Sequence, residues 1–115
     1  MKSICKLKDI YKALFEFEAM FLSTYGITIN EGIILCMLSE GSRNAGEICT
    51  DCSLSTSRLS KVLGSLEVKG YVTRSIGEKD RRVVIVSLTE KGLDKVTAMK
   101  AEDICIPTPL SNLLK

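Results

Sequence analysis

Residues 55–70 read STSRLSKVLGSLEVKG, and this stretch decides the fold. Its apolar side chains recur at helical spacing, at Leu59, Val62, Leu63 and Leu66. The spacing predicts a helix over residues 55–69 that ends at Gly70. The opposite side of this helix carries small or polar residues, namely Ser57, Ser60, Lys61 and Gly64, with Arg58 beside them. A helix built for stability alone would not place serine so densely there, since serine is a mediocre helix former.

A shorter helix comes immediately before this one. Asn44 and Glu47 stand at capping-box spacing, and Ile48, Cys49 and Cys52 supply the apolar positions of a helix over 45–52. A turn over 53–55 follows. A short helix, a turn and a longer helix with a polar face together predict a helix-turn-helix.

The polar face of the longer helix indicates contact with DNA. The N-terminal half of such a helix reaches base edges in the major groove, where hydroxyl groups and positive charge are useful. The candidate DNA-contacting residues of this half are Ser55, Thr56, Ser57, Arg58, Ser60 and Lys61. Gly64 either is a tolerated surface glycine or allows a partner backbone to approach.

Two further helices are predicted upstream of the helix-turn-helix. Apolar residues at helical spacing indicate a helix over 6–24. Its apolar stripe is broad, so this helix is either central to its own core or buried against a second subunit. Thr28 and Glu31 form a capping-box pattern at the start of the next helix, which Gly41 closes.

The residue pattern changes from helix to strand after Gly70. Residues 71–76 and 82–88 are rich in β-formers and flank a polar turn, which predicts a hairpin. Thr89 caps a last helix over about 90–104, and Pro107 and Pro109 end regular structure, so 107–115 is expected to be an irregular tail. The expected fold is mainly α (α+β), a winged helix-turn-helix of about five helices with one small antiparallel hairpin, in a single domain over 1–106.

Positive charge is concentrated in one part of the chain. Residues 54–82 carry seven Lys or Arg and three Asp or Glu, whereas the whole chain has a net charge of only +2. The hairpin tip over 77–82 contains Lys79, Asp80, Arg81 and Arg82. Arginine suits a narrow minor groove, where the potential is most negative. The alternative is a solvated basic face without a partner.

The cysteines and the missing histidine exclude several other classes of protein. Five cysteines at irregular spacing do not form a disulfide scaffold, and no secretory or membrane-spanning segment is evident, so a cytoplasmic location without membrane contact is expected. Without histidine, a Walker loop or paired carboxylates, neither an enzyme nor a cofactor is expected. Cys49 and Cys52 are interpreted as small core residues. A redox role for them, or for Cys5 in the first helix, is the alternative, and metal binding is least favoured.

Three segments of the sequence resemble the MarR family of bacterial and archaeal regulators. They are LEVKGYVTR at 66–74, Asp80-Arg81-Arg82, and VSLTEKG at 86–92. The first segment is common to many winged helices, whereas the D-x-R wing followed by LTEKG is more specific. The resemblance covers roughly residues 27–96. It implies a homodimer that binds palindromic operators in double-stranded DNA, usually as a repressor, and that responds to a small-molecule effector or an oxidant.

The resemblance also implies roles for individual residues. The helix over 55–69 would be the recognition helix, and Arg82 would enter the minor groove with Asp80 orienting it. Arg74 would lie at the base of the wing, near phosphate or in a structural ion pair. The segments 1–25 and 89–106 would contribute to dimerisation. The second of these segments departs from the family pattern, because only 26 residues follow Thr89 and Pro107 interrupts them.

Two alternatives to the DNA-binding regulator remain open from sequence. Winged helices also serve as protein–protein interaction modules that bind no nucleic acid. Such a module would expose apolar or acidic residues on the longer helix, and this chain has Ser, Arg and Lys there. A redox-sensing regulator would share the DNA-binding function and differ only in its signal.

Overall fold

The computed structural model describes the backbone of residues 2–101 and the side chains of residues 4–100. Within this described part, eight elements follow one another: α1 (Lys2–Tyr25), α2 (Ile29–Leu38), β1 (Arg43–Asn44), α3 (Ala45–Cys52), α4 (Thr56–Val68), β2 (Val72–Ile76), β3 (Val84–Leu88) and α5 (Glu90–Ala101). This order confirms the expected mainly α winged helix-turn-helix with five helices. The chain divides into two compact units, and the larger one is residues 30–101.

Helix α1 makes up most of the described part of the smaller unit. It begins at Lys2, four residues before the predicted start, and ends where Gly26 adopts φ +71° and donates its N–H to the carbonyl of Leu22. Aromatic rings spaced four residues apart touch along one side of the helix. Several large apolar side chains are exposed: Ile4, Leu7, Tyr11, Leu14, Phe15 and Leu22.

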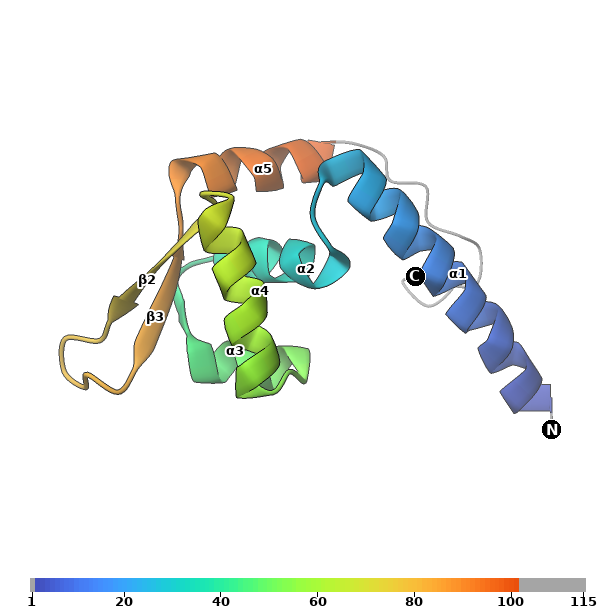
Figure 1. The fold of residues 1–115 in the computed structure, drawn as a ribbon, viewed down its shortest axis with the longest axis horizontal. Helices are drawn as coiled ribbons and strands as arrows, with labels where there is room; N and C mark the ends of the chain where they lie inside the picture. Colours follow the sequence, from blue (N-terminus) through green and yellow to red (C-terminus); the bar gives the residue numbers. More distant parts are fainter. Residues whose placement is uncertain (1, 102–115) are drawn as a thin grey trace. The chain divides into compact units, whose positions relative to one another are not determined.

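The larger unit contains a three-stranded antiparallel sheet in the order β1-β3-β2. The prediction of a single hairpin was therefore incomplete, because β1 pairs through only two residues, Arg43 and Asn44. A strand this short has no alternating pattern to detect. The hairpin strands are also shorter than predicted, since Tyr71, Arg82 and Val83 lie outside them. Figure 1 shows hairpin β2–β3 projecting from the helices of this unit.

The core of the larger unit is formed by aliphatic side chains from its helices and from the sheet. The fully or almost fully buried ones are Ile34, Leu35, Leu38, Ile48, Leu59, Leu63, Leu66, Val72, Val86 and Val96. Leu59, Leu63 and Leu66 are the residues that the sequence places on the apolar side of α4. Their burial leaves the opposite side of α4 available to solvent.

The start of α5 is fixed against the loop between α4 and β2. Thr89 Oγ1 accepts from the N–H of Gly92 and so caps the helix, as predicted. Thr89 also donates to the carbonyl oxygens of Gly70 and Tyr71. A side chain at Gly92 would collide with the Tyr71 carbonyl, so only glycine fits here. The predicted residues 102–104 of this helix and the predicted tail over 107–115 lie outside the described residues.

Candidate nucleic-acid interface

The turn between α3 and α4 is fixed by backbone hydrogen bonds and by the capping residues of the two helices. Asn44 Oδ1 accepts from the N–H of Glu47 at 2.8 Å, and the N–H of Asn44 donates to Glu47 Oε1 at 3.4 Å, so the predicted capping box is confirmed. Helix α3 ends at Cys52, and its C-cap Ser53 adopts the left-handed φ of +53°. Ser55 Oγ accepts from the N–H of Arg58 at 3.1 Å and caps α4. The predicted DNA contact Ser55 therefore already serves the helix as its cap.

The rest of the predicted contact face of α4 is open to solvent. The exposed residues are Thr56, Ser57, Arg58, Ser60 and Lys61. Except for Thr56, which is in the first turn on the side of Leu59 and Leu63, they lie away from the buried leucines, so the packing of α4 does not require them. Hydroxyl and cationic groups on one exposed helix face can bind base edges and phosphates.

The tip of the wing holds an arginine in a defined position. Asp80 Oδ1 accepts from the backbone N–H of Arg82 at 3.0 Å and from its Nε at 3.3 Å. The Arg82 side chain is 92% exposed, and Lys79 and Arg81 are exposed beside it. An ion pair this exposed is worth only about 0.2–1 kcal/mol, so its effect is to orient Arg82 rather than to stabilise the wing.

Arg74 connects the wing to the longer helix. Its Nη2 forms an ion pair with Glu67 Oε1 on α4. The resemblance implies that Arg74 lies either near phosphate or in a structural ion pair, and the structure shows the ion pair. Because both side chains are about one-third exposed, solvent screens this pair and its contribution to stability is modest.

A groove lies between α3, α4 and the wing, all within the larger unit. Its volume is about 460 Å³. Its polar lining includes Thr56 and Ser60 of α4, Arg74 of β2 and Arg82 of the wing. The groove thus brings residues from both predicted contact elements to one concave surface.

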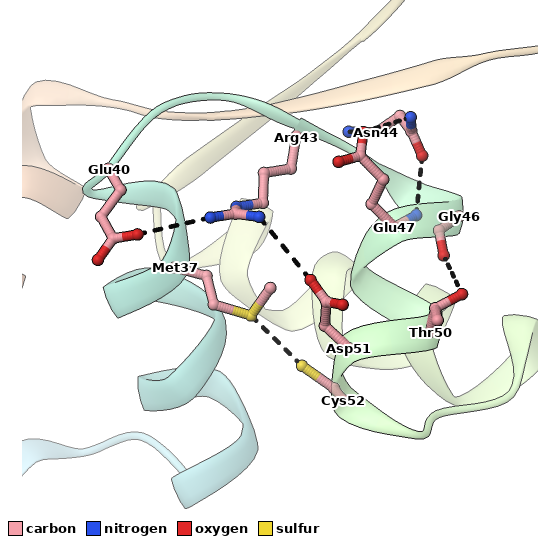
Figure 2. Close-up of polar contacts among 9 residues, drawn as sticks. All are labelled: Met37, Glu40, Arg43, Asn44, Gly46, Glu47, Thr50, Asp51 and Cys52. Carbon is pink, nitrogen blue, oxygen red and sulfur yellow. Dashed lines mark hydrogen bonds and ion pairs between the residues drawn. The ribbon is translucent and has the colours of Figure 1, made fainter.

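A second arginine, Arg43, joins the sheet to the shorter helix. Figure 2 shows its guanidinium between Glu40 and Asp51, at 3.5 Å and 3.8 Å respectively. Asp51 belongs to α3 and Arg43 to β1, so the pair ties the helix-turn-helix to the sheet. Sequence analysis missed this contact because nothing in the sequence indicates strand β1.

Cys49 and Cys52 are half-buried on α3 rather than fully buried in the core. Cys52 Sγ lies 3.5 Å from Met37 Sδ. Figure 2 shows this contact between α3 and α2. Burial raises the pKa of the Cys52 thiol, and the neighbouring Asp51 and Cys49 raise it further. The thiol, which reacts poorly with oxidants, is therefore the favoured form. Cys5 is exposed on α1, and no three His, Cys, Asp or Glu side chains of the described chain converge on a metal site.

Within residues 2–101, no single helix is long and apolar enough to cross a membrane. Only the adjacent helices α1 and α2, counted together across the break between them, reach that length and composition.

Known proteins resemble this chain in both sequence and fold. Residues 16–99 match the family described as transcriptional regulator SarA/Rot. The HTH-type transcriptional regulator SarZ of Staphylococcus epidermidis is 33% identical over 75 residues, which cover 64% of this chain and 51% of SarZ. The chain thus spans about half the length of the curated relatives it matches.

Solved structures extend the likeness over almost the whole chain. The transcriptional regulator BldR of Sulfolobus solfataricus has a TM-score of 0.77 at 25% identity, with 98% of this chain and 77% of BldR covered. Overoxidised AbfR bound to DNA also has a TM-score of 0.77, at 27% identity, with 98% of this chain and 85% of AbfR covered. The resemblance to MarR regulators is confirmed, because SarA/Rot proteins are MarR-like winged helices. The chain belongs to the SarA/Rot family of transcriptional regulators.

Proposed function

We propose that this protein is a transcriptional regulator that binds double-stranded DNA in a sequence-specific manner. Helix α4 enters the major groove, and its exposed residues Ser57, Ser60 and Lys61 contact base edges or phosphates. The wing over 77–82 lies at the minor groove, and Arg82 enters it. The observation that carries the proposal is the groove in which the exposed face of α4 and the oriented Arg82 meet.

The chemistry of this surface favours nucleic acid over a protein partner. The exposed face of α4 carries hydroxyls and two cationic side chains, and the wing tip has more basic than acidic residues. A protein-interaction module would instead expose apolar or acidic groups here. A solved relative, AbfR, is seen bound to DNA, which supports the same use of the fold.

The finer features of the proposal concern assembly and regulation. The apolar side chains exposed on α1, among them Tyr11 and Phe15, suit burial against a second copy of the chain. A homodimer would bind a palindromic operator, because its two-fold symmetry would match that of the DNA. We further propose that it acts as a repressor in the cytoplasm, has no enzymatic activity, and responds to a small-molecule effector.

Selection from a random duplex library, followed by titration, tests the proposal. The wild-type chain, with thiols kept reduced, is used to enrich binding sequences, and the best duplex is titrated by fluorescence anisotropy at two salt concentrations. We expect enrichment of a palindrome whose affinity falls steeply with salt, since phosphate contacts release counterions. A library that yields no preferred sequence and no salt-dependent binding would favour the protein-interaction module.

A further inference from the structure

Glu31 is a buried carboxylate that the proposed DNA interface does not use. Its side chain is only 4% exposed. Ser65 Oγ donates to Glu31 Oε2 at 2.9 Å, and Lys69 Nζ lies 3.1 Å from Oε1 and 3.0 Å from Oε2. Glu31 belongs to α2, Ser65 to α4, and Lys69 is the C-cap of α4. The contact therefore joins two helices that are more than 30 residues apart in sequence.

An ion pair with a buried carboxylate is a costly way to hold two helices together, even though the Lys69 side chain is 34% exposed. Taking a carboxylate out of water is expensive, and well-packed apolar residues of similar volume often stabilise a fold at least as much. Apolar contacts are non-directional, whereas hydrogen bonds depend on distance and angle. What Glu31 adds is therefore a defined geometry between α2 and α4.

The partners of Glu31 on α4 make this geometry restrictive. Ser65 and Lys69 are four residues apart and thus lie on the same side of α4. A single carboxylate that accepts hydrogen bonds from both fixes the rotation of α4 about its axis and its position along that axis. The apolar contacts of Leu63 and Leu66 alone would allow small shifts of either kind.

The rotation of α4 matters for the residues at its other end. Ser57, Ser60 and Lys61 are on the same rigid helix, about two to three turns before Lys69. A rotation of about 10° would move a side chain at the helix surface by about 1 Å. Recognition groups must be held within about 0.5 Å of their working position, so a shift of this size would impair base contacts.

We propose that Glu31, with Ser65 and Lys69, is a positioning group that holds α4 in the orientation that reads DNA. This inference rests on the proposed function. It gives Lys69 a positioning role rather than a phosphate contact, although Lys69 belongs to the basic stretch over 54–82. Glu31 and Lys69 act on DNA only through the orientation of α4.

The pair Glu31→Leu and Lys69→Met, made singly and together, tests this role. The double variant replaces the ion pair with apolar groups of similar volume and is expected to stay folded, unfolding a few degrees below the wild type because Glu31→Leu also removes the predicted capping contact with Thr28. Anisotropy titrations use the duplex selected by the wild type and a scrambled duplex of equal length, each at two salt concentrations. Lys100→Met, which changes an exposed lysine of α5, is the matched control.

We expect the folded double variant to bind the selected duplex about tenfold more weakly, the scale of one lost base contact. Binding to the scrambled duplex should change less than about twofold, and the salt slope should stay that of the wild type. Ser65→Ala, a milder change that leaves the ion pair in place, should reduce the preference for the selected duplex in the same direction, by about two- to threefold.

Two results would overturn the positioning role. A double variant or Ser65→Ala that keeps the wild-type preference would show that the contact serves stability alone. A salt slope reduced by about one in Lys69→Met would instead make Lys69 a phosphate contact. A wild-type chain that prefers no duplex would overturn the proposed function itself, which is a distinguishable outcome because it appears before any variant is made.

Discussion

The two ends of helix α4 differ in what they bind. Near its C-terminal end, Ser65 and Lys69 are bound to α2 through Glu31, and Glu67 is bound to β2 through Arg74. Toward its N-terminus, Ser57, Ser60 and Lys61 are exposed, and the structure gives their side chains no polar partner within residues 2–101. One end is therefore anchored to the protein, while the other is left for a ligand.

Because one end is anchored and the other is exposed, α4 is held rigidly while part of its surface stays free to bind a ligand. The anchored end fixes the helix without using the N-terminal residues that read DNA. Substitutions at the anchored end should reduce stability or DNA selectivity, whereas substitutions at the exposed end should reduce affinity and leave stability unchanged.

The largest effect is expected from Leu66→Ala at the anchored end. Leu66 is fully buried, so its truncation leaves a cavity and should lower the free energy of unfolding by about 2–5 kcal/mol. Urea unfolding followed by circular dichroism measures this. The matched control is Val68→Ala on the same helix, where the side chain is 90% exposed and a change within about 0.5 kcal/mol is expected. Equal losses for both variants would mean that α4 is not anchored as described.

Arg82→Ala should have the next largest effect, and on binding rather than stability. Loss of a groove contact should weaken binding to the selected duplex by about 1–3 kcal/mol. The unfolding temperature should stay that of the wild type, because the Arg82–Asp80 pair is exposed. Anisotropy titration beside Lys100→Ala provides the comparison. Wild-type affinity in the Arg82 variant would remove the wing from the proposed interface.

Ser55→Ala tests the N-cap of α4, the residue that borders its exposed end. Because Ser55 Oγ caps α4, its removal should lower the free energy of unfolding by about 1 kcal/mol. Ser55→Asn supplies another capping oxygen and should restore most of that loss. Thermal unfolding of the two variants distinguishes capping from a DNA-contacting role alone, which would leave both as stable as the wild type.

The smallest effect is expected from Glu67→Gln, which neutralises the partner of Arg74. The pair is about one-third exposed, so the stability loss should be no more than about 1 kcal/mol. Denaturant unfolding of Glu67→Gln, Arg74→Gln and the double variant measures the coupling between the two positions. Losses that simply add would show that the ion pair contributes nothing to holding the wing on α4.

Periodic features of the chain could be predicted from sequence, and isolated ones could not. The apolar spacing of α4, the capping box of Asn44 and Glu47, and the hairpin all carry local signals. Strand β1 was missed because it has two residues, too few for a pattern. The partners of Glu31 were also missed, because Ser65 and Lys69 are 34 and 38 residues away and only the packing of α2 on α4 brings them together.

The candidate site likewise has some features that could be predicted from sequence and others that could not. The exposure of Ser57, Ser60 and Lys61 follows from their position opposite the buried leucines, which the sequence gives directly. The ion pair of Arg74 depends on how the wing packs on α4, so sequence left a choice between phosphate and carboxylate. The groove between α3, α4 and the wing is a tertiary feature without any sequence signal.

The most direct test of the central claim is the affinity of the double variant Ser60→Ala/Lys61→Ala for the selected duplex, measured beside its unfolding temperature. We predict a loss of binding to that duplex at an unchanged or slightly higher unfolding temperature, because alanine favours helix and neither side chain packs in the core. Wild-type affinity in this variant would contradict the claim that the exposed end of α4 reads DNA.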